Sequence, residues 1–441
     1  MNSFDSTLPK KFLCAAFVLL LFLGVSPHLL SQSPDTGQQE NEFRQYSGEV
    51  TDSDSKKPLV FATVGLDGSN ISTVTNADGD FSLKIPLDIE QGSITVAFLG
   101  YSSKSIPLSE LKPENNKISL DVSIIQLTEV NISFPKSAET LVRETLKRKG
   151  ENYFNDPTVM TAFYRETIKR RRRNVSLSEA VVNIYKAPYD SEKRDVVQLY
   201  KSRKSTDYSK LDTLALKLEG GPFNALFVDL MKYPQFIFNE GSISNYVFSF
   251  DNSTRVNDKE VYVVNFKQRE NVPTPLYTGK LYIDADNHVL TSAIYSLNIT
   301  DVEMAAQLFV RKKPANANVW PTDVAYRVDY REKDGKWYYG YSNVLLEFKI
   351  NWDDRLFNSV YSLTAEMAVT DWEKNLEKNS LKSRDRMKSN IILADEAVGF
   401  SDPDFWGEYN IIEPEKSIES AIRKIQRQLK RNKNGGVASL P

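Results

Sequence analysis

The sequence predicts a mainly β protein, built from an N-terminal β-sandwich and a larger curved antiparallel sheet, or incomplete barrel, with a few helices. Apolar residues occupy every second position in the runs between Tyr46 and Tyr101, and turn-forming residues separate these runs. This spacing is typical of half-buried strands. After residue 150, ten more strand-like segments follow, with few helical ones. A sheet of about ten strands must curve, close or be covered, because flat open edges invite aggregation.

The alternation in the first region defines its strands. Between the first and second runs, residues 75–80 have the sequence Thr-Asn-Ala-Asp-Gly-Asp, which suits a tight turn with side-chain caps and a positive φ. The alternating apolar positions are Val60, Ala62, Val64 and Leu66, then Phe81, Leu83 and Ile85, then Ile94, Val96 and Phe98.

Four ordered segments of this region resemble the carboxypeptidase-regulatory-like domain, a module common in cell-envelope proteins of the Bacteroidetes. They are residues 48–52, 58–64, 75–83 and 96–101. The resemblance spans about eighty residues. It implies a seven-stranded, prealbumin-like or immunoglobulin-like sandwich over residues 45–126, and it implies that this module is not itself a peptidase.

Residues 1–31 have the pattern of a secretory signal peptide, because Lys10 and Lys11 precede an apolar run over residues 12–25 and polar residues follow near Ser31. The run is shorter than the roughly twenty residues that span a membrane. We therefore expect cleavage near Ser31 and a flexible leader over residues 32–44, with an uncleaved anchor as the alternative. Cys14 lies inside the removed segment, so the exported chain has no disulfide and its fold relies on burial.

Composition narrows the range of partners. The chain has 441 residues, of which 41% are hydrophobic, and a net charge of −2. These values fit two or three domains and provide no basic excess for nucleic acid. No other apolar stretch approaches spanning length. Together with the resemblance, this predicts a location in the periplasm or at the periplasmic face of the outer membrane, with an envelope protein complex or a lipid as partner.

A second, β-rich domain is predicted over residues 135–413. It begins with a helix that Ser137 can cap and that ends near Gly150. A short helix is predicted over residues 222–232, and hairpin turns over residues 284–287 and 333–336. The predicted strands are residues 161–168, 175–185, 195–201, 246–256, 259–267, 278–284, 289–298, 324–330, 337–350 and 361–371.

Two further segments carry resemblances. Residues 277–284 and 287–290 resemble paired strands of the lipoprotein-carrier (LolA-like) fold, which cradles acyl chains under a helix. Residues 402–415 are similar to the closing segment of a group of exported Bacteroidetes proteins that also carry the regulatory-like sandwich. An amphipathic helix is predicted over residues 414–434 from the helical spacing of its apolar residues, and residues 435–441 form a tail.

Little in the sequence points to catalysis, and we assign no catalytic residue. His288 is the single histidine outside the signal peptide and lies in a predicted turn. A Ser-His-Asp or Cys-His arrangement would have to use His288, but the exported chain has no cysteine and no Gly-x-Ser-x-Gly motif. A zinc site would draw on several histidine or cysteine residues, so no metal or cofactor is expected. The acidic pairs Asp353 with Asp354, and Asp78 with Asp80, fall at turns, where carboxylates usually cap backbone groups.

Two clusters are candidate contact sites. The basic run Lys169, Arg170, Arg171, Arg172 and Arg173 joins two predicted strands, as a solvated loop or as a contact for anionic headgroups. Aromatic residues concentrate over residues 320–352, where they pack the sheet or line a site for an apolar or glycan ligand. Alternation places Trp337, Tyr339 and Tyr341 on one face. The candidate ligand-binding residues are Trp320, Tyr326, Trp337, Tyr339, Tyr341 and Trp352.

The favoured hypothesis is a non-catalytic exported cell-envelope protein with a binding or assembly role, which handles an apolar ligand or docks to an outer-membrane complex. One alternative is a carboxylate-dependent hydrolase of peptide or glycan, which two close carboxyl groups with displaced pKa values in a cleft would favour. Another is an accessory module of a TonB-dependent outer-membrane transport system.

Overall fold

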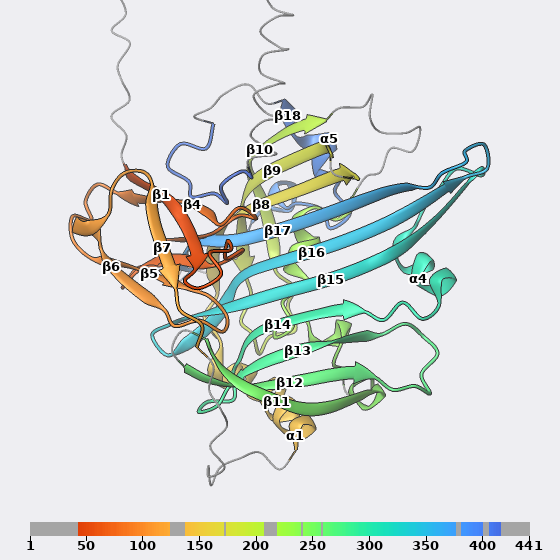
Figure 1. Ribbon diagram of the computed structural model, residues 1–441, viewed down its shortest axis with the longest axis horizontal. Helices are drawn as coiled ribbons and strands as arrows, with labels where there is room; N and C mark the ends of the chain where they lie inside the picture. The colour runs from red at the N-terminus through yellow and green to blue at the C-terminus, as the bar shows by residue number, and fades with distance from the viewer. Residues whose placement is uncertain are drawn as a thin grey trace, which may run out of the picture. The chain divides into compact units, whose positions relative to one another are not determined.

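The computed structural model describes residues 43–123, 137–171, 173–206, 218–239, 241–256, 259–375, 381–399 and 405–415. The expected fold class is confirmed, because a seven-stranded sandwich is followed by a large, mostly antiparallel sheet with few helices (Figure 1). The predicted signal peptide, nearly all of the leader, Arg172, the tail, and the predicted C-terminal helix beyond Glu415 lie outside the described residues.

The sandwich consists of a three-stranded and a four-stranded sheet. Its buried alternating residues include Val64, Phe81, Leu83 and Ile94, as the period-two pattern predicts. The first sheet has the order β4 (Asp80–Pro86), β1 (Phe43–Asp52) and β7 (Asn116–Leu120), and the second has the order β3 (Ser72–Val74), β2 (Thr63–Leu66), β5 (Ser93–Ala97) and β6 (Lys104–Pro107).

Side chains cap the predicted turns. The Asn76 Oδ1 atom accepts hydrogen bonds from the backbone N–H groups of Asp78 and Asp80, both at 2.9 Å. In the turn over residues 333–336, Asp334 and Gly335 have φ values of 53° and 73°, which a tight hairpin turn requires. Asp78 lies in the first of these turns and Asp80 begins β4, and Asn76 provides the capping side chain.

The large sheet has eleven strands, in the order β11-β12-β13-β14-β15-β16-β17-β8-β9-β10-β18. All neighbours are antiparallel except β10 and β18. Within the described residues β11 and β18 are its two edges, so the sheet does not close into a barrel. Each of the ten predicted strands is present, several of them longer than predicted. Their bounds are β8 (Thr158–Arg170), β9 (Arg173–Lys186), β10 (Val196–Thr206), β11 (Tyr246–Val256), β12 (Lys259–Gln268), β13 (Tyr277–Asp284), β14 (Leu290–Leu297), β15 (Ala317–Lys333), β16 (Lys336–Trp352), β17 (Ser359–Lys374) and β18 (Val398–Gly399).

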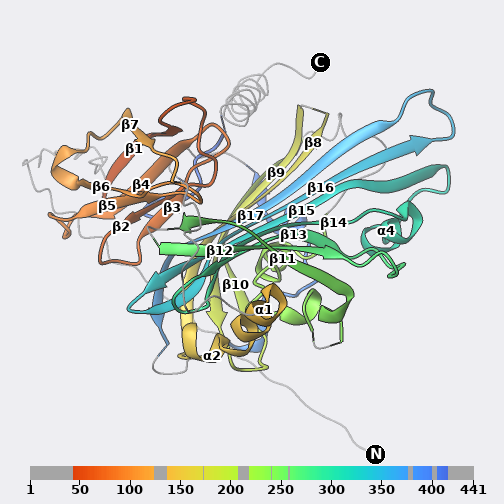
Figure 2. The same ribbon diagram turned by 60° about the horizontal axis from the view of Figure 1, so that its bottom comes forward.

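Short helices pack on this sheet (Figure 2). The predicted first helix is α1 (Ala138–Lys147), whose N-cap Ser137 accepts a hydrogen bond from the Thr140 N–H at 3.1 Å, and α2 (Lys149–Asn152) follows it. α1 contacts β11, and α3 (Pro222–Leu226) contacts β16 and β17. Sequence reasoning missed α4 (Val302–Phe309), which packs on β15, and the short α5 (Leu393–Glu396).

The predicted helix over residues 222–232 is too long, because α3 ends at Leu226. Beyond it, the backbone N–H groups of Val228 and Asp229 bond to carbonyls three residues earlier, at 3.2 and 3.1 Å, so the chain continues as tighter turns. These turns direct the Asp229 carboxylate into the interior, where it meets a buried lysine.

Residues 405–415, the described part of the distinctive C-terminal string, join the sandwich to one face of the large sheet. The Asn410 side chain bonds to both backbone groups of Lys84 in β4, accepting from its N–H at 2.7 Å and donating to its carbonyl at 3.0 Å. The Arg165 guanidinium in β8 donates to the Ile412 carbonyl at 2.7 Å. Trp406 and Ile412 lie in one buried cluster with Phe163 of β8 and Val74 of β3.

We expect Asn410→Ala to destabilise the protein by about 1–2 kcal/mol, since two partly buried backbone groups of Lys84 lose their partners. Chemical denaturation should show this loss. Asn316→Ala, at an exposed position, is the matched control. Equal midpoints for both variants would contradict the bridging role of Asn410.

Candidate functional site

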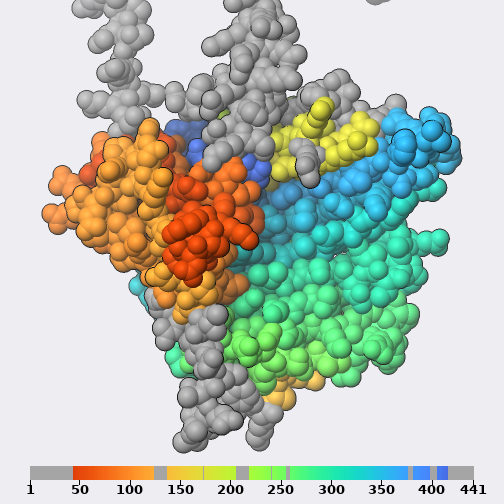
Figure 3. Space-filling view, viewed as in Figure 1, coloured from red at the N-terminus to blue at the C-terminus, as the bar shows by residue number. Residues whose placement is uncertain are grey.

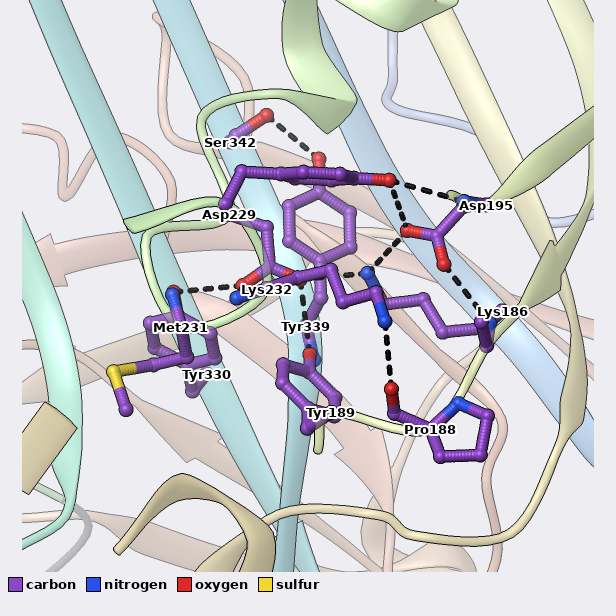
Figure 4. A network of polar contacts seen from close by, with 12 residues as sticks. Lys186, Pro188, Tyr189, Asp195, Asp229, Met231, Lys232, Tyr330, Tyr339 and Ser342 are labelled. Carbon is purple, nitrogen blue, oxygen red and sulfur yellow. Dashed lines mark hydrogen bonds and ion pairs between the residues drawn. The ribbon is translucent and has the colours of Figure 1, made fainter. Parts of the chain in front are cut away.

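A buried ionic network lies at the end of β9 (Figure 4). The Lys186 ammonium group lies 2.7 Å from a carboxylate oxygen of Asp195 and 2.7 Å from one of Asp229, and all three side chains are at most 2% exposed. Burial acts to lower the pKa of Lys186, but the two carboxylates outweigh it and raise that pKa. The lysine therefore stays charged and neutralises part of the acidic pair.

Tyrosine hydroxyl groups complete this network. Tyr189 and Tyr330 donate to the Asp229 carboxylate at 3.0 and 2.9 Å, and Tyr233 donates to Asp195 at 2.8 Å. Burial, and secondarily the Asp229 charge, raises the pKa of Tyr189 and of Tyr330 well above the usual value of 10.0. These hydroxyls therefore remain protonated donors at neutral pH.

A groove of about 770 Å³ opens beside the network, between the α1–α2 region, residues 191–194 and residues 232–243. Lys232 and Tyr233 belong to both the groove lining and the buried network. Lys232 donates to the carbonyls of Pro188 and Ser191 at 2.6 and 2.7 Å, which fixes the loop beside the groove. Desolvation, together with the charges of Lys186 and Lys149, lowers the pKa of Lys232 despite the nearby aspartates.

The groove is strongly cationic. Among the described residues that line it, six are basic and Glu192 is the one acid. Arg143 is paired with Glu139 at 2.8 Å along α1. The wall of the groove also contains the apolar side chains of Leu146, Phe238 and Ile243. The basic residues are Arg143, Lys147, Lys149, Lys193, Arg194 and Lys232.

The hydrolase alternative requires two close carboxyl groups in a cleft. Asp195 and Asp229 are the close carboxylate pair that the hydrolase alternative requires, but both are buried and bonded to Lys186. A second buried set, Glu179 and Glu366, is paired with Arg165 at 2.6 and 3.2 Å. Neither pair lines the groove. Within the described ranges, no group of three His, Cys, Asp or Glu residues could hold a metal ion.

The predicted aromatic site residues are spread over several places, and none of the six is among the described residues lining the groove. Tyr326 stacks on Tyr295 with ring centroids 5.0 Å apart. Trp337 lies under the Lys259 ammonium at 5.4 Å, and Trp352 under the Arg355 guanidinium at 4.9 Å. Trp320 is partly buried in β15, opposite Lys349. The ligand-binding role of these residues stays a prediction.

The expectation that Tyr339 and Tyr341 share a face is wrong. The register between β15 and β16 shifts so that Asp329 pairs with Tyr341 while Tyr330 pairs with Tyr339. This bulge breaks the alternation. The Tyr339 hydroxyl lies 2.6 Å from the Ser342 hydroxyl in the core near α3, whereas the Tyr341 ring lies 5.0 Å from Phe61 of the sandwich.

The predicted basic run forms the connection between β8 and β9. Lys169 pairs with Glu415 at 3.2 Å, and the Arg170 guanidinium lies 6.0 Å from the ring centre of Tyr361. Arg171 has a φ of 55° and its N–H donates to the Val360 carbonyl at 3.0 Å, while Arg173 begins β9. The run therefore lies at the end of β9 opposite Lys186. Its role with anionic headgroups stays a prediction.

Sequence reasoning missed the groove and the network. Lys147 and Lys149 were recognisable only as basic residues at a helix end, and Lys193 with Arg194 as a short charged loop. Lys186, Asp195 and Asp229 carry no local pattern, because a buried ion pair is assembled from separate elements. His288 lies in the β13–β14 turn, with its Nδ1 atom 3.4 Å from Glu144.

Comparison with known proteins supports the N-terminal resemblance. Residues 46–132 match the family model of the CarboxypepD_reg-like domain. No curated protein matches the chain. In the described part of the chain, no helix is both long and apolar enough to cross a membrane.

The solved structures similar to this chain show only weak likeness. A DUF1329 family protein from Desulfovibrio piger has 9% identity and a TM-score of 0.25, over 55% of this chain and 96% of that one. A LolA superfamily protein from Nitrosomonas europaea has 9% identity and a TM-score of 0.22, over 58% of this chain and 100% of that one. The MucA/MucB complex of Pseudomonas aeruginosa has 13% identity and a TM-score of 0.17, over 54% and 98%. These TM-scores are too low to assign a shared fold or to transfer a function.

Proposed function

We propose that this chain is a non-catalytic exported cell-envelope protein that binds an anionic amphiphile in the cationic groove. The observation that carries the proposal is the ratio of six basic residues to one acidic residue around a groove with apolar patches in its wall. A ligand that satisfies both features carries phosphate or carboxylate groups and an apolar portion. A negatively charged lipid is the simplest member of this class.

The size of the groove fits such a ligand. Small-molecule sites have volumes of about 300–1,000 Å³ and combine apolar walls with a few convergent polar groups, and this groove has about 770 Å³. Lys193 and Arg194 are exposed at its rim, so they can meet an anion from solvent. The buried network beneath holds Tyr233 and the Lys232 loop in place, which keeps the groove preformed.

Export is supported by the signal-peptide pattern of residues 1–31. A role without bond-breaking is supported by the pairing of both buried carboxylate sets with Lys186 and Arg165. None of these carboxylates is among the described residues that line the groove.

The proposal is tested by titrating the purified protein with a short-chain phosphatidylglycerol below its micelle concentration, followed by tryptophan fluorescence or calorimetry. We expect saturable binding, and at least about tenfold weaker binding for the Lys193→Ala/Arg194→Ala variant, which removes two charge-assisted contacts. Lys117→Ala, exposed on β7 of the sandwich, is the control and should bind normally. Inorganic phosphate measures the headgroup contribution alone.

Equal affinity for short-chain phosphatidylcholine would refute the preference for an anion. Unchanged binding by the double variant would place the ligand elsewhere.

The affinity should also fall as pH rises, because Lys232 loses its proton below the usual lysine pKa of 10.5. Binding of an anion stabilises the charged lysine, so it should raise the pKa of Lys232 and be accompanied by proton uptake in alkaline buffer. Calorimetry in two buffers of different ionisation enthalpy measures this uptake. A pH-independent affinity between neutral pH and pH 10 would exclude Lys232 from ligand binding.

A further inference from the structure

The connection between β16 and β17 presents two large apolar side chains to solvent. Leu356 is 96% exposed and Phe357 is 80% exposed, more than any other large hydrophobic residue in the described ranges. β16 and β17 are seventeen and sixteen residues long. The hairpin that joins them projects beyond its neighbours at one end of the large sheet (Figures 1 and 3). Folding leaves most of the surface of both side chains in solvent, so packing in the core does not explain them.

Two other connections lie beside this hairpin tip. Tyr361 of β17 pairs with Arg170, and the Arg171 N–H bonds to the Val360 carbonyl at 3.0 Å, which places the β8–β9 connection on one side. On the other side, the Asp353 N–H bonds to the Asn316 carbonyl at 3.1 Å, so the segment from α4 to β15 adjoins the tip. α4 exposes Val302 and Leu308, at 45% and 56%.

The charge around the exposed apolar residues is positive. The described residues of the three connections, within 169–173, 301–316 and 353–358, contain eight basic and four acidic side chains. Arg311 is 79% exposed at its side chain although it pairs with Glu219. Exposed apolar side chains next to an excess of basic ones are the combination that binds a membrane surface, because apolar groups enter the acyl boundary while cations meet anionic headgroups.

We propose that this end of the sheet, the docking end, binds an anionic lipid bilayer surface, with Leu356 and Phe357 inserted below the headgroups. The β16–β17 hairpin carries the two apolar side chains, and the β8–β9 connection provides four of the eight basic residues. Neighbouring β9 runs from Arg173 at the docking end to Lys186 beside the cationic groove. The docking end is therefore separate from the groove, and the two proposals can fail independently.

The test is co-sedimentation of the purified full-length protein with vesicles of phosphatidylcholine containing about one-third phosphatidylglycerol. We expect binding that weakens as the salt concentration rises from about 0.1 to about 0.5 M. The Leu356→Ser/Phe357→Ser variant should bind at least about tenfold more weakly, because burial of two large apolar side chains is lost. The Arg171→Gln/Arg173→Gln variant should bind several-fold more weakly and with a smaller salt dependence.

Leu87→Ser is the matched control, since Leu87 is 48% exposed in the sandwich, outside the docking end. Thermal unfolding of each variant verifies that the exposed substitutions leave the fold intact. If wild type and the Leu356→Ser/Phe357→Ser variant (the tip variant) bind anionic vesicles equally well, the proposal is overturned. Oligomers in sedimentation velocity that disappear in the tip variant, without vesicle binding by wild type, would also overturn it and assign the tip to a second copy of the chain.

Discussion

Lys186→Met should destabilise the protein by about 3–5 kcal/mol, the usual cost of removing one partner from a buried ion pair. Methionine fills a similar volume but leaves the Asp195 and Asp229 carboxylates without their bonded cation in an interior where both side chains are 0% exposed. The neighbouring tyrosine hydroxyls remain as donors, but they carry no positive charge. We expect the unfolding temperature to fall by roughly 5–10 °C in calorimetry.

The triple variant Lys186→Met/Asp195→Asn/Asp229→Asn distinguishes the charge from the packing. It removes the uncompensated carboxylates, so it should recover part of the lost stability, since neutral replacement of a buried ion set is far less costly than breaking it. Lys117→Met, an exposed position on β7, should be nearly neutral. If the triple variant is less stable than Lys186→Met alone, the electrostatic explanation is wrong.

Glu166→Gln should change how stability depends on pH. Burial raises the pKa of the Glu166 carboxyl from 4.5 to about 7, although the Tyr164 hydroxyl, 3.1 Å away, acts in the opposite direction. Between these values the folded protein holds a proton that the unfolded chain releases, so stability falls as pH rises from about 4.5 through about 7. This difference between the folded and unfolded pKa of Glu166 lowers the free energy of unfolding by about 3 kcal/mol at alkaline pH. Glutamine carries no titrating group and should abolish this component.

Urea unfolding of wild type and Glu166→Gln at a series of pH values from 5 to 8 measures the effect. The variant should gain stability relative to wild type as pH rises. Glu260→Gln, at an exposed position at the start of β12, should keep the wild-type profile. Parallel profiles for wild type and Glu166→Gln would show that Glu166 does not titrate in this range.

Local periodicity predicted most of the fold. The alternating runs of the sandwich and the ten strand-like segments after residue 150 are strands in the structure, and Ser137 marked the start of α1. α4 was missed because eight residues provide little helical periodicity, although its N-cap Asp301 accepts a hydrogen bond from the Met304 N–H at 2.9 Å. The pairing of β17 with β8 was not predictable, since no local pattern selects a partner about two hundred residues away.

The candidate sites were less predictable than the fold. The basic run at Lys169 to Arg173 was visible because its charges are consecutive, and the structure adds the exposed hairpin residues beside it. The groove gathers Lys149, Arg194 and Lys232 from three separate segments. A single inserted residue between Tyr339 and Tyr341 reversed the predicted orientation of Tyr341 relative to Tyr339, because alternation does not survive a bulge.

The attachment of residues 405–415 affects the order in which this protein can fold. Arg165 meets Glu366 and the Ile412 carbonyl, residues that lie 201 and 247 positions later in the chain. β8 therefore cannot form all of its contacts until nearly all of the described chain has been synthesised. Contacts of such long sequence separation form slowly, so β8 waits longer for its partners than a strand that pairs with its neighbour in sequence.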